Sequence, residues 1–239
     1  MHIRAVYRHS SATRTPRTFT RHAPAMRVYR PDLHPSLFSL AGDLKRWLDL
    51  GLVLAGGLLL FPVLMMVAIA IRLDSHGPVL FRQRRVGLHG SEFTIYKFRT
   101  MYLDAEHRLA GLQRFNEMEG PLFKMKDDPR VTRVGRFLRR TSLDELPQLL
   151  NVLRGEMSLV GPRPPLPAEV AQFQPCHNHK FDVRPGITGL WQVSGRNALT
   201  SFEQMIELDL TYIRQWSLAA DLRILARTVG VVLTTRGAS

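Results

Sequence analysis

The chain has 239 residues, enough for one domain with a substantial hydrophobic core and a smaller appendage. Its 33 basic and 20 acidic side chains give a formal net charge of +13, and the isoelectric point is near 10.9. Nucleic acid, anionic lipid headgroups and phosphorylated substrates would all be attracted, and charge alone does not choose among them. The single cysteine, Cys176, excludes an intramolecular disulfide and fits a reducing compartment or the cytoplasmic face of a membrane.

Residues 1–40 are basic, with seven arginines and one acid, Asp32. No helical or strand period runs through them, so we expect a disordered basic arm. Close to anionic lipid, such an arm would gain about 1 kcal/mol for each basic residue at the surface.

From Leu50 to Ile71 no residue is charged, and about 20 apolar residues are enough for one bilayer crossing. The run is too long, and begins too far into the chain, for a cleaved signal peptide. A transmembrane helix and a re-entrant hairpin both remain open. Positive charge prefers the cytoplasmic side, so basic residues at both ends favour the hairpin. They are Lys45 and Arg46 before the run, and Arg72, Arg82, Arg84 and Arg85 after it.

Pro62, near the middle of the run, removes a backbone donor and favours a kink there. Gly56 and Gly57 weaken the helix just before it. Asp49 would be costly deep in lipid, so we expect it at the membrane interface, beside Lys45 or Arg46.

Beyond residue 74 the sequence predicts a basic domain of the α/β class that is mostly helical, with a small sheet. Two short strands, 79–81 and 93–97, flank a glycine-containing turn at 87–90. Helices, several of them amphipathic, are expected at 101–119, 146–153, 201–216 and 218–234, and loops at 161–167 and 184–197.

Asp144 and Glu145 are adjacent carboxylates that closely follow the basic run 136–140. This combination is typical of a phosphate site, because cations hold the anion while carboxylates attack it or bind a metal. A structural alternative is a capping box, in which Ser142 and Glu145 satisfy the free amides at a helix start. That alternative leaves Asp144 only as a residue that interacts favourably with the helix dipole.

Arg163 is the strongest of the other anion-binding candidates. It lies between two prolines, and a restricted backbone limits where its guanidinium can reach. Each candidate alone is more typical of a solvated surface charge. The others are Lys97, Arg99, Arg139, Arg184 and Arg196.

Two further motifs contain side chains that can ligate a metal. Asp127-Asp128 precedes Pro129, which favours a simple turn. Cys176-His-Asn-His179 matches no standard zinc spacing, and no second ligand pair is visible. Neither motif predicts a metal centre.

A series of short motifs resembles the bacterial sugar transferase family, the monotopic polyprenyl-phosphate phosphoglycosyltransferases that begin exopolysaccharide and O-antigen assembly. The resemblance covers about residues 43–236, and so many motifs in one order make chance agreement negligible. The motifs are Lys45-Arg-x-x-Asp49, the central Pro62, Gly77-Pro-Val-Leu-Phe-Arg-Gln83, Tyr96-Lys-Phe-Arg-Thr-Met101, Ser142-Leu-Asp-Glu-Leu-Pro-Gln148, Asn151-Val-Leu-Arg-Gly-Glu-Met-Ser158, Val160-Gly-Pro-Arg-Pro164, Arg184-Pro-Gly-Ile-Thr-Gly189 and Ser194-Gly-Arg-Asn197.

The resemblance implies that residues 43–74 form a re-entrant helix-break-helix in the cytoplasmic leaflet of the bacterial inner membrane, with the break at Pro62. Residues 75–236 would form the catalytic domain, facing the cytoplasm. The family usually has Ser-Pro at the break. This chain has Phe61-Pro62, so the hydroxyl that could satisfy a freed carbonyl is missing and the break angle stays open. The chain resembles the short form of the family, without further N-terminal spans.

The resemblance also implies a reaction, the transfer of a sugar-1-phosphate from a UDP-sugar to undecaprenyl phosphate with release of UMP. Asp144 matches the family's nucleophile and Glu145 its Mg²⁺-binding partner. Lys97, Arg139 and Arg163 fall where phosphate contacts are expected, and Asp209 matches a further acidic position.

The expected partners are the UDP-sugar, undecaprenyl phosphate and inner-membrane lipid, not nucleic acid. The segments around Trp191 and Trp216 are most similar to members that use UDP-glucose or UDP-galactose. The oligomeric state, a homodimer included, is left open. The rival hypothesis is a non-enzymatic basic membrane-surface binding module, whose binding would be salt-dependent and indifferent to Asp144.

Overall fold

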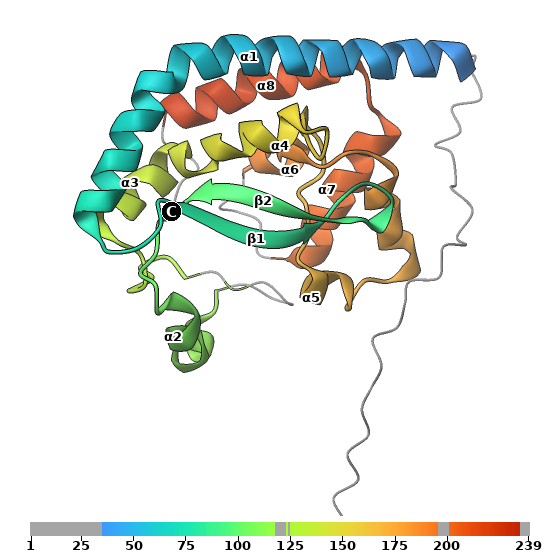
Figure 1. The fold of residues 1–239 in the computed structure, drawn as a ribbon. Coiled ribbons are helices and arrows are strands. Elements are labelled where there is room, and N and C mark those ends of the chain that lie inside the picture. The colour runs from blue at the N-terminus through green and yellow to red at the C-terminus, as the bar shows by residue number, and fades with distance from the viewer. Residues whose placement is uncertain (1–34, 118–122, 124, 196–200, 235–239) are drawn as a thin grey trace, which may run out of the picture.

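The computed structural model describes residues 35–117, 123, 125–195 and 201–234. Within these ranges the chain is mostly helical, with two two-stranded sheets (Figure 1). The basic arm predicted for 1–40 lies outside the described residues as far as residue 34, and from Pro35 onward it belongs to the first helix.

The helices that follow the first are short until the end of the chain. They are α2 (Ala105–Leu112), α3 (Arg133–Thr141), α4 (Leu149–Leu153), α5 (Pro167–Val170), α6 (Leu190–Val193), α7 (Phe202–Arg214) and α8 (Leu218–Thr234). The 3-10 turns are η1 (Leu88–Gly90), η2 (Gln113–Phe115), η3 (Leu143–Gln148) and η4 (Pro175–Asp182).

The last two helices lie where the sequence predicted them, whereas α2 is shorter than the predicted helix at 101–119. Met101 pairs with Val131 in an isolated antiparallel bridge, so the backbone at 101 is extended and the helix begins only at Ala105.

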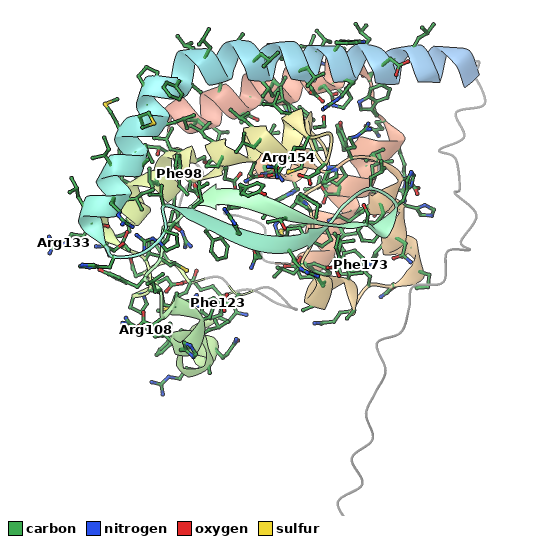
Figure 2. All side chains as sticks on the ribbon, in the orientation of Figure 1. Phe98, Arg108, Phe123, Arg133, Arg154 and Phe173 are labelled. Atoms are coloured by element: carbon green, nitrogen blue, oxygen red, sulfur yellow. The ribbon has the colours of Figure 1, made fainter. Side chains whose placement is uncertain are left out.

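The apolar run forms one helix, α1 (Pro35–Asp74), which continues through Pro62. Among the described residues it is the one helix long and apolar enough to cross a membrane, from Leu40 onward. Figure 1 shows that α1 changes direction part-way along, and Figure 2 shows side chains projecting from its outer side. A proline inside a helix is a common cause of such a bend. The element is therefore one bent helix, where the sequence predicted two helices separated by a break.

Both halves of α1 pack against the same domain. Val53, in the first half, belongs to a buried cluster with Ile95 and Val152. Val67, in the second half, belongs to another buried cluster with Leu138 of α3. Both halves of the apolar helix therefore pack against the same domain.

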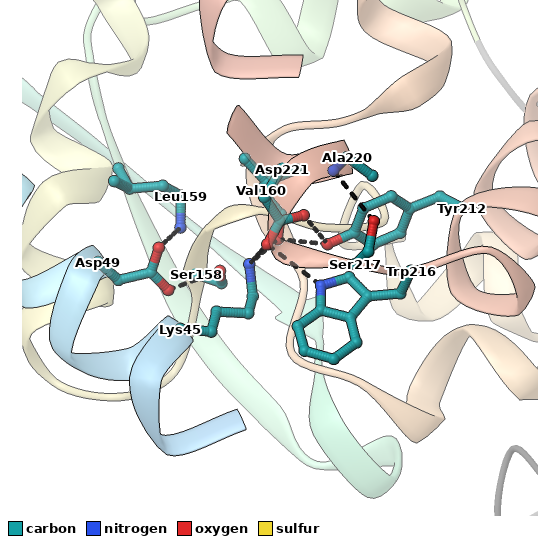
Figure 3. Close-up of polar contacts among 10 residues, drawn as sticks. All are labelled: Lys45, Asp49, Ser158, Leu159, Val160, Tyr212, Trp216, Ser217, Ala220 and Asp221. Carbon is teal, nitrogen blue, oxygen red and sulfur yellow. Dashed lines mark hydrogen bonds and ion pairs between the residues drawn. The ribbon is translucent and has the colours of Figure 1, made fainter. Parts of the chain in front are cut away.

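A largely buried cluster of polar side chains binds the first half of α1 to the rest of the domain (Figure 3). Lys45 Nζ donates to the Asp221 carboxylate at 2.5 Å and to the Val160 carbonyl at 3.1 Å. Asp49 accepts a hydrogen bond from the Ser158 hydroxyl at 2.7 Å.

Asp49 was expected at the membrane interface beside Lys45 or Arg46, and its hydrogen bonds are instead to the domain. Asp49 is buried, and its partners are Ser158 and the Leu159 backbone. Lys45, four residues earlier, pairs with a carboxylate of α8 instead. Side chains four apart on a helix can interact, but that pairing is weak, and here each charge has a partner in the domain.

Two strands form a hairpin that carries part of the site. β1 (Leu80–Val86) and β2 (Glu92–Phe98) pair antiparallel around η1, which confirms the predicted strands and turn and extends the first strand by several residues. Gln83 lies opposite Ile95. Since successive side chains of a strand point to opposite faces, Gln83, Arg85, Ile95 and Lys97 share one face of the hairpin.

The outer edge of β2 is covered by α4. Asn151 donates to the Thr94 carbonyl at 2.7 Å and accepts from the Tyr96 backbone at 3.2 Å. Its buried amide therefore takes the hydrogen bonds that a neighbouring strand would make with β2, and it attaches the hairpin to α4.

The second sheet joins the segment of Arg163 to the C-terminal part of the chain. β3 (Ser158–Val160) pairs in parallel with β4 (Gly186–Thr188), so the predicted loop at 184–197 contains a strand and α6. A side chain at Gly186 would place its Cβ 2.0 Å from the Gly161 backbone nitrogen. Only glycine permits this approach, which holds the segment before Arg163 against β4. Helices α7 and α8 cover this pair, with Val160 in their core.

Candidate active site

Asp144 and Glu145 lie on η3, directly after α3. Thr132 caps the start of α3 by accepting from the Gly135 backbone at 2.9 Å. The helix ends at Ser142, which has left-handed backbone angles of φ 55° and ψ 16°. This conformation is uncommon for a residue with a Cβ, and it turns the chain so that the two carboxylates follow on a separate 3-10 turn.

The capping-box alternative is wrong. The Ser142 side chain makes no capping hydrogen bond at the start of η3. The Glu145 carboxylate instead accepts from Lys97 Nζ at 2.8 Å, in a half-buried ion pair. The helix predicted at 146–153 is accordingly η3 followed by α4, because Pro147 cannot donate the backbone hydrogen bond of a regular helix.

A cavity of about 140 Å³ opens beside this turn. Three predicted site residues, Lys97, Glu145 and Arg163, come together in its wall although they are far apart in sequence. Asp144 is half-buried on the same turn as Glu145. The wall also contains polar and aromatic residues that were not predicted as site residues, among them Arg85, Gln148 and Trp191.

Arg85 could have been found by extending the first predicted strand. The sequence predicts this strand only at 79–81, and Arg85 is then one of the basic residues that follow the apolar run. Strand alternation over 80–86 instead places Arg85 on the same face as Lys97. Gln148 has no comparable periodic pattern around it, because side chains of an irregular turn do not alternate between buried and exposed positions in a regular way.

Arg163 enters the cavity wall from the loop after β3. Its guanidinium donates to Glu169 at 3.0 Å, and the Glu169 carboxylate also accepts from the Leu166 backbone at 3.0 Å. Glu169 is 1% exposed. This buried carboxylate holds the guanidinium, and the prolines on either side restrict the backbone that carries it.

Asp209 of α7 lies behind this loop rather than among the residues of the cavity wall. It is 1% exposed and pairs with Lys180 at 2.7 Å. Burial raises its pKa, although Lys180 and Arg163 act in the opposite direction. The structure therefore places Asp209 as a buried support near Arg163.

Three other predicted cations, Arg139, Arg99 and Arg184, are not among the residues of the cavity wall. Arg139 is half-buried and donates to the Thr100 hydroxyl at 3.0 Å. Arg99 is buried and donates to the Ser75 and His76 carbonyls after α1. Arg184 is exposed and donates to the Gly155 carbonyl, and Arg196 lies outside the described residues.

The described residues contain no group of three or more histidine, cysteine or acidic side chains suited to a metal ion. Asp128 pairs with Arg130 at 2.6 Å, and His177 with Glu203 at 3.1 Å. The chemistry of the Asp144–Glu145 pair nevertheless fits Mg²⁺, which takes oxygen ligands and is commonly held by one or two carboxylates together with substrate phosphates.

The family model for bacterial sugar transferases matches residues 40–235. Helix α1, the hairpin, the carboxylate turn and the cavity all lie within this range. The chain belongs to the bacterial sugar transferase family.

Several curated proteins are similar over most of this chain. The galactosyl transferase CpsE of Streptococcus agalactiae serotype III is 46% identical over 194 residues, which are 81% of this chain and 43% of that protein. The UDP-galactose-lipid carrier transferase of Erwinia amylovora is 44% identical over 199 residues, 82% of this chain and 41% of that protein. The chain thus spans less than half the length of these two relatives.

A shorter relative is covered more fully. The UDP-glucose:undecaprenyl-phosphate glucose-1-phosphate transferase of Caulobacter vibrioides is 47% identical over 206 residues, which are 81% of this chain and 71% of that protein.

Proposed function

We propose that this chain is a phosphoglycosyltransferase that transfers a sugar-1-phosphate from a UDP-sugar to undecaprenyl phosphate and releases UMP. The names of the similar proteins support the reaction class. The observation that carries the proposal is the cavity in which Lys97 and Arg163 meet Glu145, one residue from Asp144. Cations beside two carboxylates suit a diphosphate that must be held and then attacked.

Asp144 is the proposed nucleophile. A carboxylate oxygen attacks the β-phosphorus of the donor, a new P–O bond forms, and UMP leaves with the electron pair of the broken bond. An oxygen of undecaprenyl phosphate then attacks the same phosphorus, and the Asp144 carboxylate is regenerated. Glu145, with the donor phosphates, would hold Mg²⁺, which supplies neutralisation of the diphosphate charge.

We further propose that α1 enters and leaves the cytoplasmic leaflet of the bacterial inner membrane, with its bend near Pro62. Both halves of α1 pack on one domain, and one domain cannot lie on two sides of a bilayer. Leu58 and Leu59, just before the proline, are 81% and 78% exposed, as lipid contact requires. A site on such a hairpin reaches the acceptor phosphate at headgroup level, which avoids extracting the chain at about 0.8 kcal/mol per methylene.

The donor we favour is UDP-glucose or UDP-galactose, since similar proteins are named for both sugars. The product would enter exopolysaccharide assembly, in keeping with the ExoY proteins that this chain resembles at 39–41% identity.

The test is UMP release by detergent-purified protein with Mg²⁺, undecaprenyl phosphate and each UDP-sugar. Asp144→Asn removes the nucleophilic oxygen, so we expect a loss of about 10³-fold or more. Asp127→Asn, at an exposed aspartate of another turn, is the matched control and should keep full activity.

Mass spectrometry of protein incubated with donor alone separates the covalent route from direct transfer. We expect a glycosyl-phosphate adduct on the peptide that contains Asp144. Absence of the adduct, together with donor turnover only when acceptor is present, would rule out the aspartyl intermediate.

A further inference from the structure

Arg85 is the most deeply buried cation of the cavity wall. The residue is 8% exposed, whereas the side chains of Lys97 and Arg163 are 25% and 28% exposed. It lies near the end of β1, on the hairpin face that also carries Lys97, and its guanidinium reaches the loop of Arg163.

Backbone and amide groups, not carboxylates, hold the Arg85 guanidinium. Gln83 Oε1 accepts from Nε at 3.1 Å and from Nη2 at 2.6 Å. The Pro164 carbonyl accepts from Nη1 at 3.1 Å. These contacts use three of the five N–H groups of a guanidinium. Within the described part of the chain, one N–H on each Nη remains without a protein acceptor.

The two nearby carboxylates are already paired with other cations. Glu145 pairs with Lys97, and Glu169 with Arg163. Burial, and then the like charge of Arg163, lower the pKa of Arg85, and the two carboxylates only partly oppose this effect. The wall therefore carries one buried positive charge that has no anion of its own among the described residues, an arrangement that is unfavourable until an anion binds.

We infer that Arg85 binds a phosphate group of the nucleotide donor, and that Gln83 positions its guanidinium for this contact. The inference rests on the proposed function, because it assumes that the ligand is a diphosphate. The planar guanidinium is held by Gln83 and Pro164 and keeps one N–H on each Nη with which it can donate to phosphate oxygens.

The first test measures binding of inorganic pyrophosphate by titration calorimetry, which needs no turnover. Arg85→Gln removes charge-assisted hydrogen bonds, so the dissociation constant should rise about 10- to 100-fold. Arg85→Lys keeps the charge but loses the fork and should bind with intermediate affinity. Arg84→Gln is the matched control, because Arg84 is exposed on the other face and pairs with Glu92. Equal pyrophosphate affinity in Arg85→Gln and wild type would overturn the inference.

A buried arginine can also support the fold, so thermal unfolding must show that each variant is folded. If Arg85→Gln fails to fold, Gln83→Met still tests the arrangement. It leaves Arg85 in place but removes the one oxygen that accepts two of its hydrogen bonds, and pyrophosphate binding should weaken a few-fold. Unchanged binding in a folded Gln83→Met protein would refute the positioning role.

Donor kinetics separate this inference from the proposed function. We expect Arg85→Gln to raise the KM for the UDP-sugar more than it lowers kcat, since the contact exists before attack. Wild-type UMP release with an unaltered donor KM in Arg85→Gln would overturn the inference alone. Arg85-dependent pyrophosphate binding without any UMP release would contradict the proposed reaction and support the anion site.

Discussion

At Glu169, burial and ion pairing act in opposite directions. Burial alone would raise the pKa of its carboxyl, but Arg163, the Leu166 backbone N–H and Arg85 together hold the pKa below its ordinary value of 4.5. At Asp209 burial has the larger effect, and the pKa of the carboxyl is raised despite Lys180. Of these two carboxylates, only Glu169 stabilises the folded protein in a way that is lost when the pH falls.

The consequence can be measured with Glu169→Gln. Because the folded pKa lies below 4.5, the ion pair stabilises the protein fully above that pH and its contribution disappears as the pH falls through the folded value. We expect the variant to be less stable than wild type by about 1–3 kcal/mol near neutral pH, and the difference to shrink on acidification. Thermal unfolding between pH 7 and pH 3 measures this difference.

A constant stability difference across that pH range would contradict the ion-pair explanation and leave only lost packing. Glu207→Gln is the control, because Glu207 is exposed, pairs with exposed Arg214, and should shift the unfolding temperature little.

Residues with a local signal could be predicted from the sequence. Arg163 was identified by its prolines and Glu145 by its neighbouring carboxylate, and both line the cavity. Arg99 was chosen on the same charge argument but holds the end of α1. A guanidinium binds neutral backbone carbonyls as well as anions, so distinguishing these roles requires knowing which strand face points into the cavity.

At the scale of elements, the junction between α3 and η3 determines where the carboxylates lie. The chain reverses at Ser142 through a left-handed conformation, and Glu145 then reaches Lys97 on β2. The sequence left a helix start open as an alternative here, because the residue types of a capping box are present. In the structure Ser142 ends α3, and its left-handed backbone conformation, not its hydroxyl, determines the direction of the following turn.

Substitutions at Ser142 distinguish these two roles. A left-handed conformation costs about 1–2 kcal/mol for a residue with a Cβ, so Ser142→Gly should be neutral to about 1 kcal/mol more stable. Ser142→Ala should be nearly neutral, and Ser142→Val, with its branched Cβ, clearly less stable. The order of unfolding temperatures measures this. A loss of about 1 kcal/mol in Ser142→Ala, with little change in Ser142→Gly, would restore the cap.

On the scale of the whole molecule, α1 is both the proposed membrane element and part of the domain's core. Its outer side carries exposed apolar residues, while its inner side contributes Val53 and Val67 to two buried clusters. The sequence predicted an apolar helical segment at 43–74, and the helix begins earlier, at Pro35. The sequence could not predict the buried contacts of Lys45 and Asp49, because these depend on β3 and α8, more than a hundred residues later.

This double role gives a topological prediction. In a Cys176→Ser background, Leu40→Cys and Arg84→Cys place single thiols at exposed positions on either side of the apolar run. If α1 is re-entrant, a membrane-impermeant maleimide should label both thiols in inverted vesicles and neither in intact spheroplasts. Wild-type protein is the reference, since its exposed Cys176 reports the side of the catalytic domain. Labelling of Leu40→Cys and Arg84→Cys from opposite sides would mean that α1 spans the bilayer, which the packing of both its halves on one domain argues against.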